Sequence, residues 1–479
     1  MRQILLAALV LLVPLPALAQ YSVVLPPSVF EKRDGERVIV VAQDAELRRE
    51  AKVVGTVPRG EDFLVEKSED DRYQVWWKGQ SVSVARADVV PFDVGIDYFT
   101  KAIRQNHMAI DYVARGRLRE KRGDLDRALD DFNQAIHLDP TQVRAYDRRG
   151  CVWIAKGELD QAMADFEMAI HHDPKHTDAF MHRGSVQYER GNFKSAITDL
   201  DTAILLDPSN SVAYYNRSVV WESQGEFEKA IADDTAAIRL DPKMVVAYLN
   251  RGNAFRDRGD LDRAMADYDI ALSLDPKNAY IYFLRGAGWK SKRDYDRAIA
   301  DYSEAIRINP RHWLAFFNRG GVWSSKGDYD NALADFNEAI RLHPRDATQH
   351  RSRGLVLRHM GKFDEALAAF DEAVRLDPKN VDAYCNRAKL RATCPVKCFR
   401  DGKKALEDSK IACDLTSWKH CWSLETLAAA YAELGQFDKA IESQKRALEV
   451  VPKVGRATFR VRLELYQAGK PYRDEPVKR

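Results

Sequence analysis

Residues 237–242 read A-I-R-L-D-P, and the same or a closely related ending returns every 34 residues along most of the chain. The proline of this ending occurs eight times without a change in spacing. Such a strict spacing indicates an array of repeated structural units, whose function lies in the surface that the stacked units present to a partner. A dedicated catalytic pocket is not expected in such an array. The eight prolines are Pro140, Pro174, Pro208, Pro242, Pro276, Pro310, Pro344 and Pro378.

Small residues occupy two fixed places in each unit of 34 residues, counted from residue 109. The eighth place is glycine or another small residue and the twentieth is alanine, which allows two helices to approach each other closely. Proline at the thirty-second place cannot continue the second helix and ends it. Each unit is therefore predicted to be two amphipathic helices joined by a tight turn. The eighth-place residues are Gly116, Gly150, Gly184, Ser218, Gly252, Gly286, Gly320, Gly354 and Ala388, and the twentieth-place alanines are Ala128, Ala162, Ala196, Ala230, Ala264, Ala298, Ala332 and Ala366.

This register resembles the tetratricopeptide repeat, and the resemblance holds over eight uninterrupted units. It implies a mostly α-helical solenoid, a right-handed superhelix of about ten helix-turn-helix units. A ninth unit ending near Thr416 is four residues too long and a tenth ends at Pro452, so the array is expected to span residues 109–452. Residues 95–108 are expected to form a linking half-repeat helix, and residues 453–479 a capping helix and tail.

The first residues have the layout of a secretory signal. Arg2 precedes an apolar run from Ile4 to Leu15, and Ala17-Leu18-Ala19 provides small residues for cleavage. We expect residues 1–19 to be a signal peptide and residues 20–36 a linker, with the mature chain in the periplasm or secreted. The alternative, an uncleaved membrane anchor, conflicts with the length of the run, because a span needs about 20 apolar residues. No stable membrane span is expected after removal of the signal.

Residues 37–94 have a different pattern, with short β-branched runs broken by glycine and proline, as in a small antiparallel barrel. The segment resembles the bacterial SH3-like domains, with a strand-turn element over residues 55–60. The resemblance rests further on Trp76 and Trp77 in the next strand and Gly79 at a hairpin, with Val82, Val84 and Val89 in the closing strands. It implies an all-β SH3-like barrel and a contact with cell-wall material.

An arginine recurs at the seventh place of nine successive units, and an aspartate recurs at the twenty-third place. We expect structural ion pairs between the two helices of each unit, because a partly buried arginine needs such a partner. The alternative is a track that binds anions. Ala369 replaces the aspartate of the eighth unit, so Arg353 is expected to be free for a ligand. The arginines are Arg115, Arg149, Arg183, Arg217, Arg251, Arg285, Arg319, Arg353 and Arg387, and the aspartates are Asp131, Asp165, Asp199, Asp233, Asp267, Asp301 and Asp335.

A peptide-binding groove is expected on the concave face of the superhelix. The family resemblance implies that asparagine at the sixth place pairs with the backbone of an extended peptide. Aromatic and basic residues at other concave places would favour a peptide with hydrophobic and acidic residues. The candidate peptide-binding residues are Asn216, Asn250, Asn318, Asn386, Tyr215, Tyr280, Phe283, Phe317, Arg256, Lys290, Arg353 and Arg358.

Five of the six cysteines gather near the C-terminal end, which in an exported chain predicts a disulfide whose pairing the sequence does not reveal. Free thiols remain an alternative. Zinc binding by Cys394, Cys398, His420 and a third cysteine is another, although the spacing matches no strong zinc signature. The sixth cysteine, Cys151, is expected to be a lone small side chain. The disulfide candidates are Cys385, Cys394, Cys398, Cys413 and Cys421.

The composition excludes several functions. The net charge is only +2, and basic and acidic residues alternate along the repeats, so nucleic acid is not an expected partner. No motif for a catalytic nucleophile or a phosphate-binding loop occurs outside the repeat pattern, so we expect no enzyme, no cofactor and no metal.

Two functions fit this sequence. The first is an exported, non-catalytic scaffold that binds a protein or peptide in the concave groove. The second is a structural cell-envelope protein, anchored to cell-wall material by the SH3-like domain, with the solenoid as a spacer or a self-association module. The sequence alone names neither the partner nor the oligomeric state.

Overall fold

The computed structural model describes residues 37–49, 52–77, 80–452 and 455–474. The predicted signal peptide, the linker and the hairpin residue Gly79 lie outside these residues. The chain divides into two units, one ending at Asp275 and the other beginning at Pro276. Among the described helices, none is long and apolar enough to cross a membrane.

Seven strands at the start of the described chain form an antiparallel sheet in the order β3-β2-β6-β5-β4-β1-β7. Apolar residues alternate along the strands, so one set of side chains builds a core; Val38, Val75 and Val84 are fully buried there. The predicted all-β region is therefore present. The strands are β1 (Arg37–Val40), β2 (Asp44–Arg49), β3 (Lys52–Pro58), β4 (Asp62–Ser68), β5 (Arg72–Trp77), β6 (Gln80–Ala85) and β7 (Val89–Pro91).

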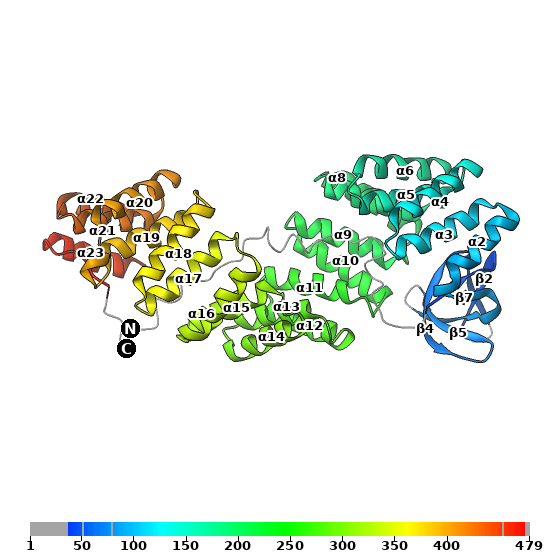
Figure 1. Cartoon of the computed structure of the whole chain (residues 1–479), viewed down its shortest axis with the longest axis horizontal. Helices are drawn as coiled ribbons and strands as arrows, with labels where there is room; N and C mark the ends of the chain where they lie inside the picture. The colour runs from blue at the N-terminus through cyan, green and yellow to red at the C-terminus, as the bar shows by residue number, and fades with distance from the viewer. Residues whose placement is uncertain (1–36, 50–51, 78–79, 453–454, 475–479) are drawn as a thin grey trace. The chain divides into compact units, whose positions relative to one another are not determined.

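The sheet is fixed to the first helical hairpin by its turn between β3 and β4. Gly60 in this turn has φ +88°, and an added Cβ would lie 2.7 Å from the Cβ of Ala114, so only glycine fits between turn and helix. Arg59 Nε donates to Asp111 Oδ1 at 2.7 Å, and Lys121 Nζ donates to Asp62 Oδ1 at 2.6 Å. The sheet thus packs on α3 (Figure 1).

Helices fill the rest of the unit that ends at Asp275 (Figure 1). The predicted linking helix is present as α2, in which Phe99, Ala102 and Ile103 are buried. Five helical hairpins follow, each built from consecutive helices with extensive contact. The helices are α2 (Gly95–Asn106), α3 (Ala109–Lys121), α4 (Leu125–Leu138), α5 (Val143–Ala155), α6 (Leu159–His172), α7 (Thr177–Glu189), α8 (Phe193–Leu206), α9 (Ser211–Ser223), α10 (Phe227–Leu240), α11 (Val245–Asp257) and α12 (Leu261–Leu274).

The unit that begins at Pro276 continues the same pattern with five hairpins and a final helix, among the described residues. The lengthened turn of the ninth repeat is the segment between α19 and α20, and it includes the short 3-10 helix Lys397–Phe399. The predicted capping helix is α23. The helices are α13 (Ala279–Ser291), α14 (Tyr295–Ile308), α15 (Trp313–Lys326), α16 (Tyr329–Leu342), α17 (Ala347–His359), α18 (Phe363–Leu376), α19 (Val381–Thr393), α20 (Gly402–Leu415), α21 (Cys421–Glu433), α22 (Phe437–Val450) and α23 (Arg456–Gln467).

The small residues at the eighth place act as predicted. A Cβ added to Gly150 would lie 2.5 Å from the ring of Phe166 on the partner helix, so glycine allows the ring to contact the helix backbone. Glycine also makes most of the turns between paired helices, as Gly157 does at φ +80°. In the sixth repeat Arg293 takes this turn position at φ +60°, a conformation that side chains disfavour. The predicted fold class, a mostly α-helical solenoid preceded by a β domain, is confirmed.

Candidate partner-binding surfaces

The arginine ladder is paired within the protein. In each of the first seven repeats the guanidinium forms an ion pair with the twenty-third-place aspartate, at N–O distances between 2.6 Å in Arg149–Asp165 and 2.8 Å in Arg319–Asp335. Aromatic residues three positions earlier cover most of these guanidiniums, as Tyr146 covers Arg149 at 5.6 Å. In the ninth repeat Arg387 pairs with Asp408 instead, at 2.6 Å. The structural interpretation therefore holds, and these arginines are not a track for anions.

Arg353 is the exception, as Ala369 predicts. Its side chain is partly buried, and its Nε hydrogen-bonds to no described residue. His350 stands at the position of the covering aromatic residue. Burial lowers the pKa of Arg353, whereas the pKa values of Arg149 and Arg183 are raised by their hydrogen-bonded aspartates. Arg353 of the eighth repeat thus lacks the ion pair with aspartate that the other seventh-place arginines form.

The four candidate asparagines are partly used inside the protein. Asn250 Nδ2 donates to Asp234 Oδ2 at 2.9 Å and to Ser218 Oγ at 3.0 Å, so its amide links α11 to both α10 and α9. Asn318 Nδ2 donates to Leu314 O, and Asn386 Nδ2 to Asp382 O. Asn216 is 1% exposed, and its Oδ1 has no hydrogen-bond partner among the described residues.

The aromatic candidates are more deeply buried than a groove lining requires. Tyr215, Phe283 and Phe317 are 4%, 3% and 7% exposed. Phe283 packs against Tyr302 and against His312, the N-cap residue of α15, with ring centroids 5.0 Å apart in the second contact. Only Tyr280 remains partly exposed, stacked on Phe283. The structure therefore places most of this aromatic set in the contacts between helices.

The charged candidates at the twelfth place of the repeats are more exposed than most of the aromatic candidates. Lys290 Nζ donates to Asn318 Oδ1 at 3.1 Å, and burial lowers the pKa of Lys290 to about 8. Arg358 is partly buried, and its Nη1 has no hydrogen-bond partner among the described residues. Arg256 is paired with the neighbouring Asp257 at 2.9 Å. Lys290 and Arg358 belong to the unit that begins at Pro276, and Arg256 belongs to the other unit.

Two acidic residues with perturbed pKa values were not singled out from the sequence. Burial raises the pKa of Glu222, at the twelfth place, to about 7, assisted by the charge of Asp257, and its Oε2 has no described hydrogen-bond partner. Asp234 is fully buried, and burial raises the pKa of its carboxyl well above the usual range. The signal for Glu222 was its place in the repeat register. Asp234 gave no signal, because solvated aspartates are common on helices.

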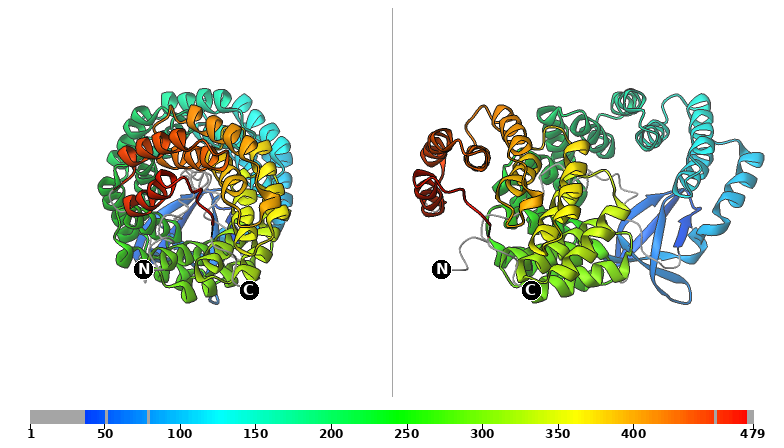
Figure 2. Two further views of the ribbon diagram at one scale, coloured as in Figure 1. Left: turned by 90° about the vertical axis from the view of Figure 1, so that its left-hand side faces the viewer. Right: turned by 60° about the vertical axis from the view of Figure 1, so that its left-hand side comes forward.

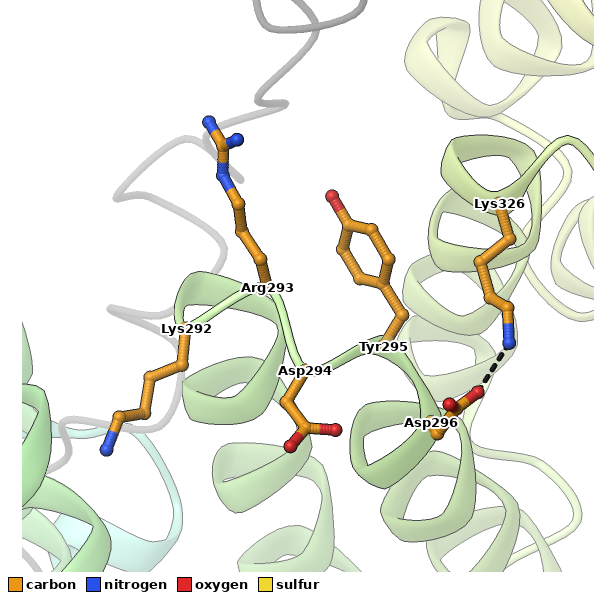
Figure 3. Close-up of a pocket in the computed structure, with 6 residues that line it drawn as sticks. All are labelled: Lys292, Arg293, Asp294, Tyr295, Asp296 and Lys326. Atoms are coloured by element: carbon orange, nitrogen blue, oxygen red, sulfur yellow. Dashed lines mark hydrogen bonds and ion pairs between the residues drawn. The ribbon is translucent and has the colours of Figure 1, made fainter. Parts of the chain in front are cut away.

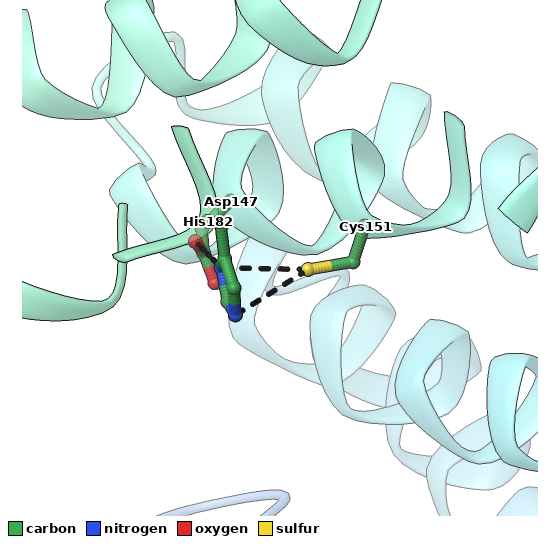
Figure 4. A group of neighbouring side chains, drawn as sticks. All are labelled: Asp147, Cys151 and His182. Carbon is green, nitrogen blue, oxygen red and sulfur yellow. Dashed lines mark hydrogen bonds and ion pairs between the residues drawn. The ribbon is translucent and has the colours of Figure 1, made fainter. Parts of the chain in front are cut away.

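Cys151 is not a lone side chain, contrary to the sequence expectation. Its sulfur lies 3.5 Å from His182 Nδ1, and the same nitrogen lies 2.8 Å from Asp147 Oδ1 (Figure 4). Burial lowers the pKa of His182, but the charges of Cys151 and Asp147 outweigh it and hold that pKa well above its usual value. Burial also raises the pKa of the Cys151 thiol.

These three residues are the only group of three or more metal-ligand side chains that converges within the described residues. The hydrogen bond to Asp147 occupies Nδ1 of His182, so Nε2, 3.9 Å from the sulfur, is the nitrogen left for an ion. All three side chains are nearly inaccessible, at 2%, 6% and 1% exposure for Asp147, Cys151 and His182. The arrangement is best described as a buried hydrogen-bonded contact between neighbouring repeats.

The C-terminal cysteines are free thiols in the structure, so the predicted disulfide is absent. Cys394 packs with Leu357, Phe363 and Leu390, whereas Cys413 packs in a different cluster with Leu424 and Leu427. Cys385 Sγ contacts Ser423 Oγ at 3.4 Å. Separate apolar surroundings explain why these cysteines, although close in sequence, do not all meet.

The zinc alternative also fails among the described residues, because His420 Nδ1 contacts Ser423 Oγ at 2.8 Å and no cysteine group converges on it.

A polar pocket of about 420 Å³ lies at the turn between α13 and α14 (Figure 3). Five of its six lining residues are charged, and Lys326 is ion-paired with Asp296 across its edge. A small-molecule site is usually lined mainly by apolar side chains, so this pocket does not have the character of one. The lining residues are Lys292, Arg293, Asp294, Tyr295, Asp296 and Lys326.

Family models match the helical array. A tetratricopeptide repeat model matches residues 113–179, 181–245, 291–347, 324–381 and 351–392. A TPR repeat model matches residues 252–287, and a further tetratricopeptide repeat model matches residues 423–453. Together the matches cover more than half of the chain. No curated protein shows significant sequence similarity to it.

Several solved structures resemble the chain. Yeast Tom70 is 17% identical, with 79% of this chain and 92% of its own covered and a TM-score of 0.42. A tetratricopeptide repeat protein from Parabacteroides merdae is 19% identical, with 51% and 97% covered and a TM-score of 0.42. YrrB, a TPR protein with an unusual peptide-binding site, is 22% identical, with 38% and 95% covered and a TM-score of 0.33.

Proposed function

We propose that this chain, which belongs to the tetratricopeptide repeat family, is an exported, non-catalytic scaffold that binds protein partners. Proteins with this fold typically bind other proteins, and the repeats present one register of side chains to a partner. The mature chain would act in the periplasm or outside the cell, after removal of residues 1–19. Its partner would bind as an extended segment along the concave places of the repeats.

The observation that carries this proposal is the contrast between two places of the repeat. Seventh-place arginines are almost all paired with aspartates of the same protein. Twelfth-place residues, in contrast, include Glu222 and Arg358, each with a buried polar atom that no described residue satisfies. Because an unsatisfied buried polar atom is costly, each of these two atoms favours an external partner in its own unit.

The alternative is a structural envelope protein whose β domain resembles the SH3-like domains and holds cell-wall material. The contacts of the sheet disfavour an open ligand groove at its tryptophans. Lys243, from the turn between α10 and α11, lies 4.0 Å above the ring of Trp76 and donates to Glu66 Oε1 at 2.8 Å. The helical part of the same unit thus covers the aromatic surface that a cell-wall ligand would need.

Charge reversal at the concave places tests the scaffold proposal. Lys290→Glu and Arg358→Glu are expected to reduce the amount of partner recovered with the purified mature chain by at least fivefold, measured by quantitative mass spectrometry. Arg307→Glu is the matched control, because Arg307 is an exposed arginine paired with Glu304 on α14. Equal recovery with all variants would contradict the proposal. Retention of the chain on purified peptidoglycan through residues 37–94 would instead support the envelope alternative.

A further inference from the structure

The C-terminal tail of the chain lies along a helix of the ninth repeat. The helix α23 ends at Gln467, and after Gly469, at φ +64°, the chain continues without regular secondary structure over residues 470–474. Figure 2 shows this segment in dark red, leaving the last helix and returning toward the helices drawn in yellow and orange. The tail therefore returns to a surface formed about 80 residues earlier in the chain.

The tail binds the C-terminal end of α19 by hydrogen bonds. The backbone N–H of Asp474 donates to Thr393 O at 2.9 Å, and Arg473 Nη1 donates to Ala392 O at 3.2 Å. Both carbonyls belong to the last turn of α19, where backbone acceptors have no partner within the helix. The hydroxyl of Thr393 lies 2.8 Å from Asp474 Oδ2. Two of these three contacts involve main-chain acceptors, and the third involves the carboxylate.

The side chain of Tyr472 supplies a second contact. It packs against the apolar cluster that contains Ala428, Ala440 and Tyr466, and the guanidinium of Arg462 lies 4.4 Å from the centre of its ring. The surface thus accepts an aromatic residue and, two positions later, an acidic one, while Arg473 between them is ion-paired with Glu433.

Two basic side chains near Asp474 form no ion pair with a described residue, whereas Arg462 beside them is ion-paired with Glu425. Lys389 Nζ has neither a hydrogen bond nor an ion pair with any described residue, and burial with the charges of Arg462 and Arg358 lowers its pKa to about 7. Arg358 Nη1 is buried and also without a described partner. By the family register, Arg358, Lys389 and Thr393 stand at the twelfth, ninth and thirteenth places, which belong to the concave face. A more acidic segment would therefore satisfy this surface better than the tail does.

We infer that the surface formed by α17, α19 and α21–α23 is a binding site for an extended, acidic partner segment with an aromatic residue two positions before an acidic one. Residues 472–474 occupy this site as an intramolecular competitor. This inference rests on the proposed scaffold function. It adds the chemistry of the partner and a mechanism by which the tail regulates partner binding. A partner segment gains access by displacing the tail, so its apparent affinity is reduced by the fraction of molecules in which the tail is bound.

The experiment uses a fluorescein-labelled peptide that copies residues 470–479 and measures its binding by fluorescence anisotropy. The chain truncated after Gly469 should bind this peptide at least tenfold more tightly than the full chain does. A peptide with Asp474→Asn should bind at least fivefold more weakly than the parent peptide. Lys389→Met in the truncated chain should weaken binding to a similar extent, whereas the matched exposed change Arg341→Gln on α16 should have no effect.

Two controls separate misfolding from loss of the site. Circular dichroism of the truncated chain must show unchanged helix content, and a full-length Arg473→Ala/Asp474→Asn variant, which keeps Tyr472 and the rest of the tail, should show an intermediate gain in affinity. Equal peptide affinity in the full and truncated chains would overturn the role of the tail as a competitor. Absence of binding to the folded truncated chain would overturn the site.

Two further outcomes have defined meanings. A concentration-dependent dimer of the full chain that disappears on truncation would show that the tail binds a second copy, and would overturn the assignment to a different protein. Peptide binding that fails while Lys290→Glu still lowers partner recovery would overturn this inference alone and leave the scaffold proposal standing.

Discussion

The hydroxyl of Thr393 lies 2.8 Å from the carboxylate of Asp474, a residue 81 positions later in the chain. An ionised carboxylate only accepts hydrogen bonds, so the hydroxyl is the donor in this contact. The same hydroxyl lies 2.7 Å from the carbonyl of Lys389, so its single proton serves two acceptors. The contact therefore holds the tail with moderate strength, as a displaceable segment requires.

Replacing Thr393 by valine should loosen the tail. The substitution keeps the shape of the side chain and removes the hydroxyl, which costs about 1 kcal/mol in a typical hydrogen bond. Backbone amides of residues 472–474 should then exchange about fivefold faster in hydrogen-exchange mass spectrometry, while amides of α21 remain unchanged. Unchanged exchange in the tail would show that the hydroxyl contributes nothing to its binding.

Giving Arg353 an aspartate partner should stabilise the protein. Ala369→Asp restores the aspartate that pairs with arginine in the first seven repeats, and should raise the free energy of unfolding by about 1 kcal/mol. The gain should disappear in the Arg353→Gln background, because the new carboxylate then lacks its partner. As a matched comparison, Asp301→Ala should lower the free energy of unfolding, since it leaves Arg285 without the aspartate at 2.7 Å. Urea unfolding of the four variants checks these values.

The raised pKa of Glu222 predicts a pH dependence of stability. Its folded-state pKa of about 7 lies above the ordinary value of 4.5 for glutamate, so between these values the folded protein binds more protons than the unfolded chain. The free energy of unfolding should therefore fall as the pH rises from about 4.5 to 7, by up to about 3 kcal/mol from this group.

Glu222→Gln should remove this component of the pH dependence. The exposed change Glu226→Gln serves as the control, and denaturant unfolding across this pH range is the measurement. If the free energy of unfolding changes with pH by the same slope in the wild type and in Glu222→Gln, the burial of this carboxyl is contradicted.

The attachment of the sheet to α3 depends on Gly60. Gly60→Ala should destabilise the protein by about 2 kcal/mol or more, because it adds both left-handed backbone strain and a contact of 2.7 Å with Ala114. Gly123→Ala is a close control, since Gly123 has φ +78° but nothing lies within 4 Å of its added Cβ. It should cost only the backbone strain, about 1 kcal/mol. If Gly60→Ala and Gly123→Ala lose the same stability in thermal unfolding, the contact with Ala114 adds no further cost.

The sequence predicted the helical array well because its determinants are local and periodic. Gly150 and Phe166 lie 16 residues apart in one repeat, and the same relation returns in nearly every unit. The ion pairs and the unpaired Arg353 follow from the same register. The capping helix, expected at residues 456–468, is present as α23 over Arg456–Gln467.

The features that escaped prediction depend on contacts between segments that no repeat specifies. The sequence does not indicate that Asp474 returns to Thr393, since the tail follows no periodic pattern. Cys151 and His182 occupy different places in successive repeats, so their contact appears only when the repeats stack. Tyr215 and Phe283 were expected to line a groove, but contacts with neighbouring helices bury them.

The most direct test of the scaffold account is site-specific photocrosslinking in the native envelope, with a photoreactive residue at position 290 or 358 and a control at Leu205, which is 79% exposed on α8. The account predicts that positions 290 and 358 crosslink to the same protein partner and that position 205 does not. Crosslinks of equal yield from all three positions, or only between copies of this chain, would contradict it.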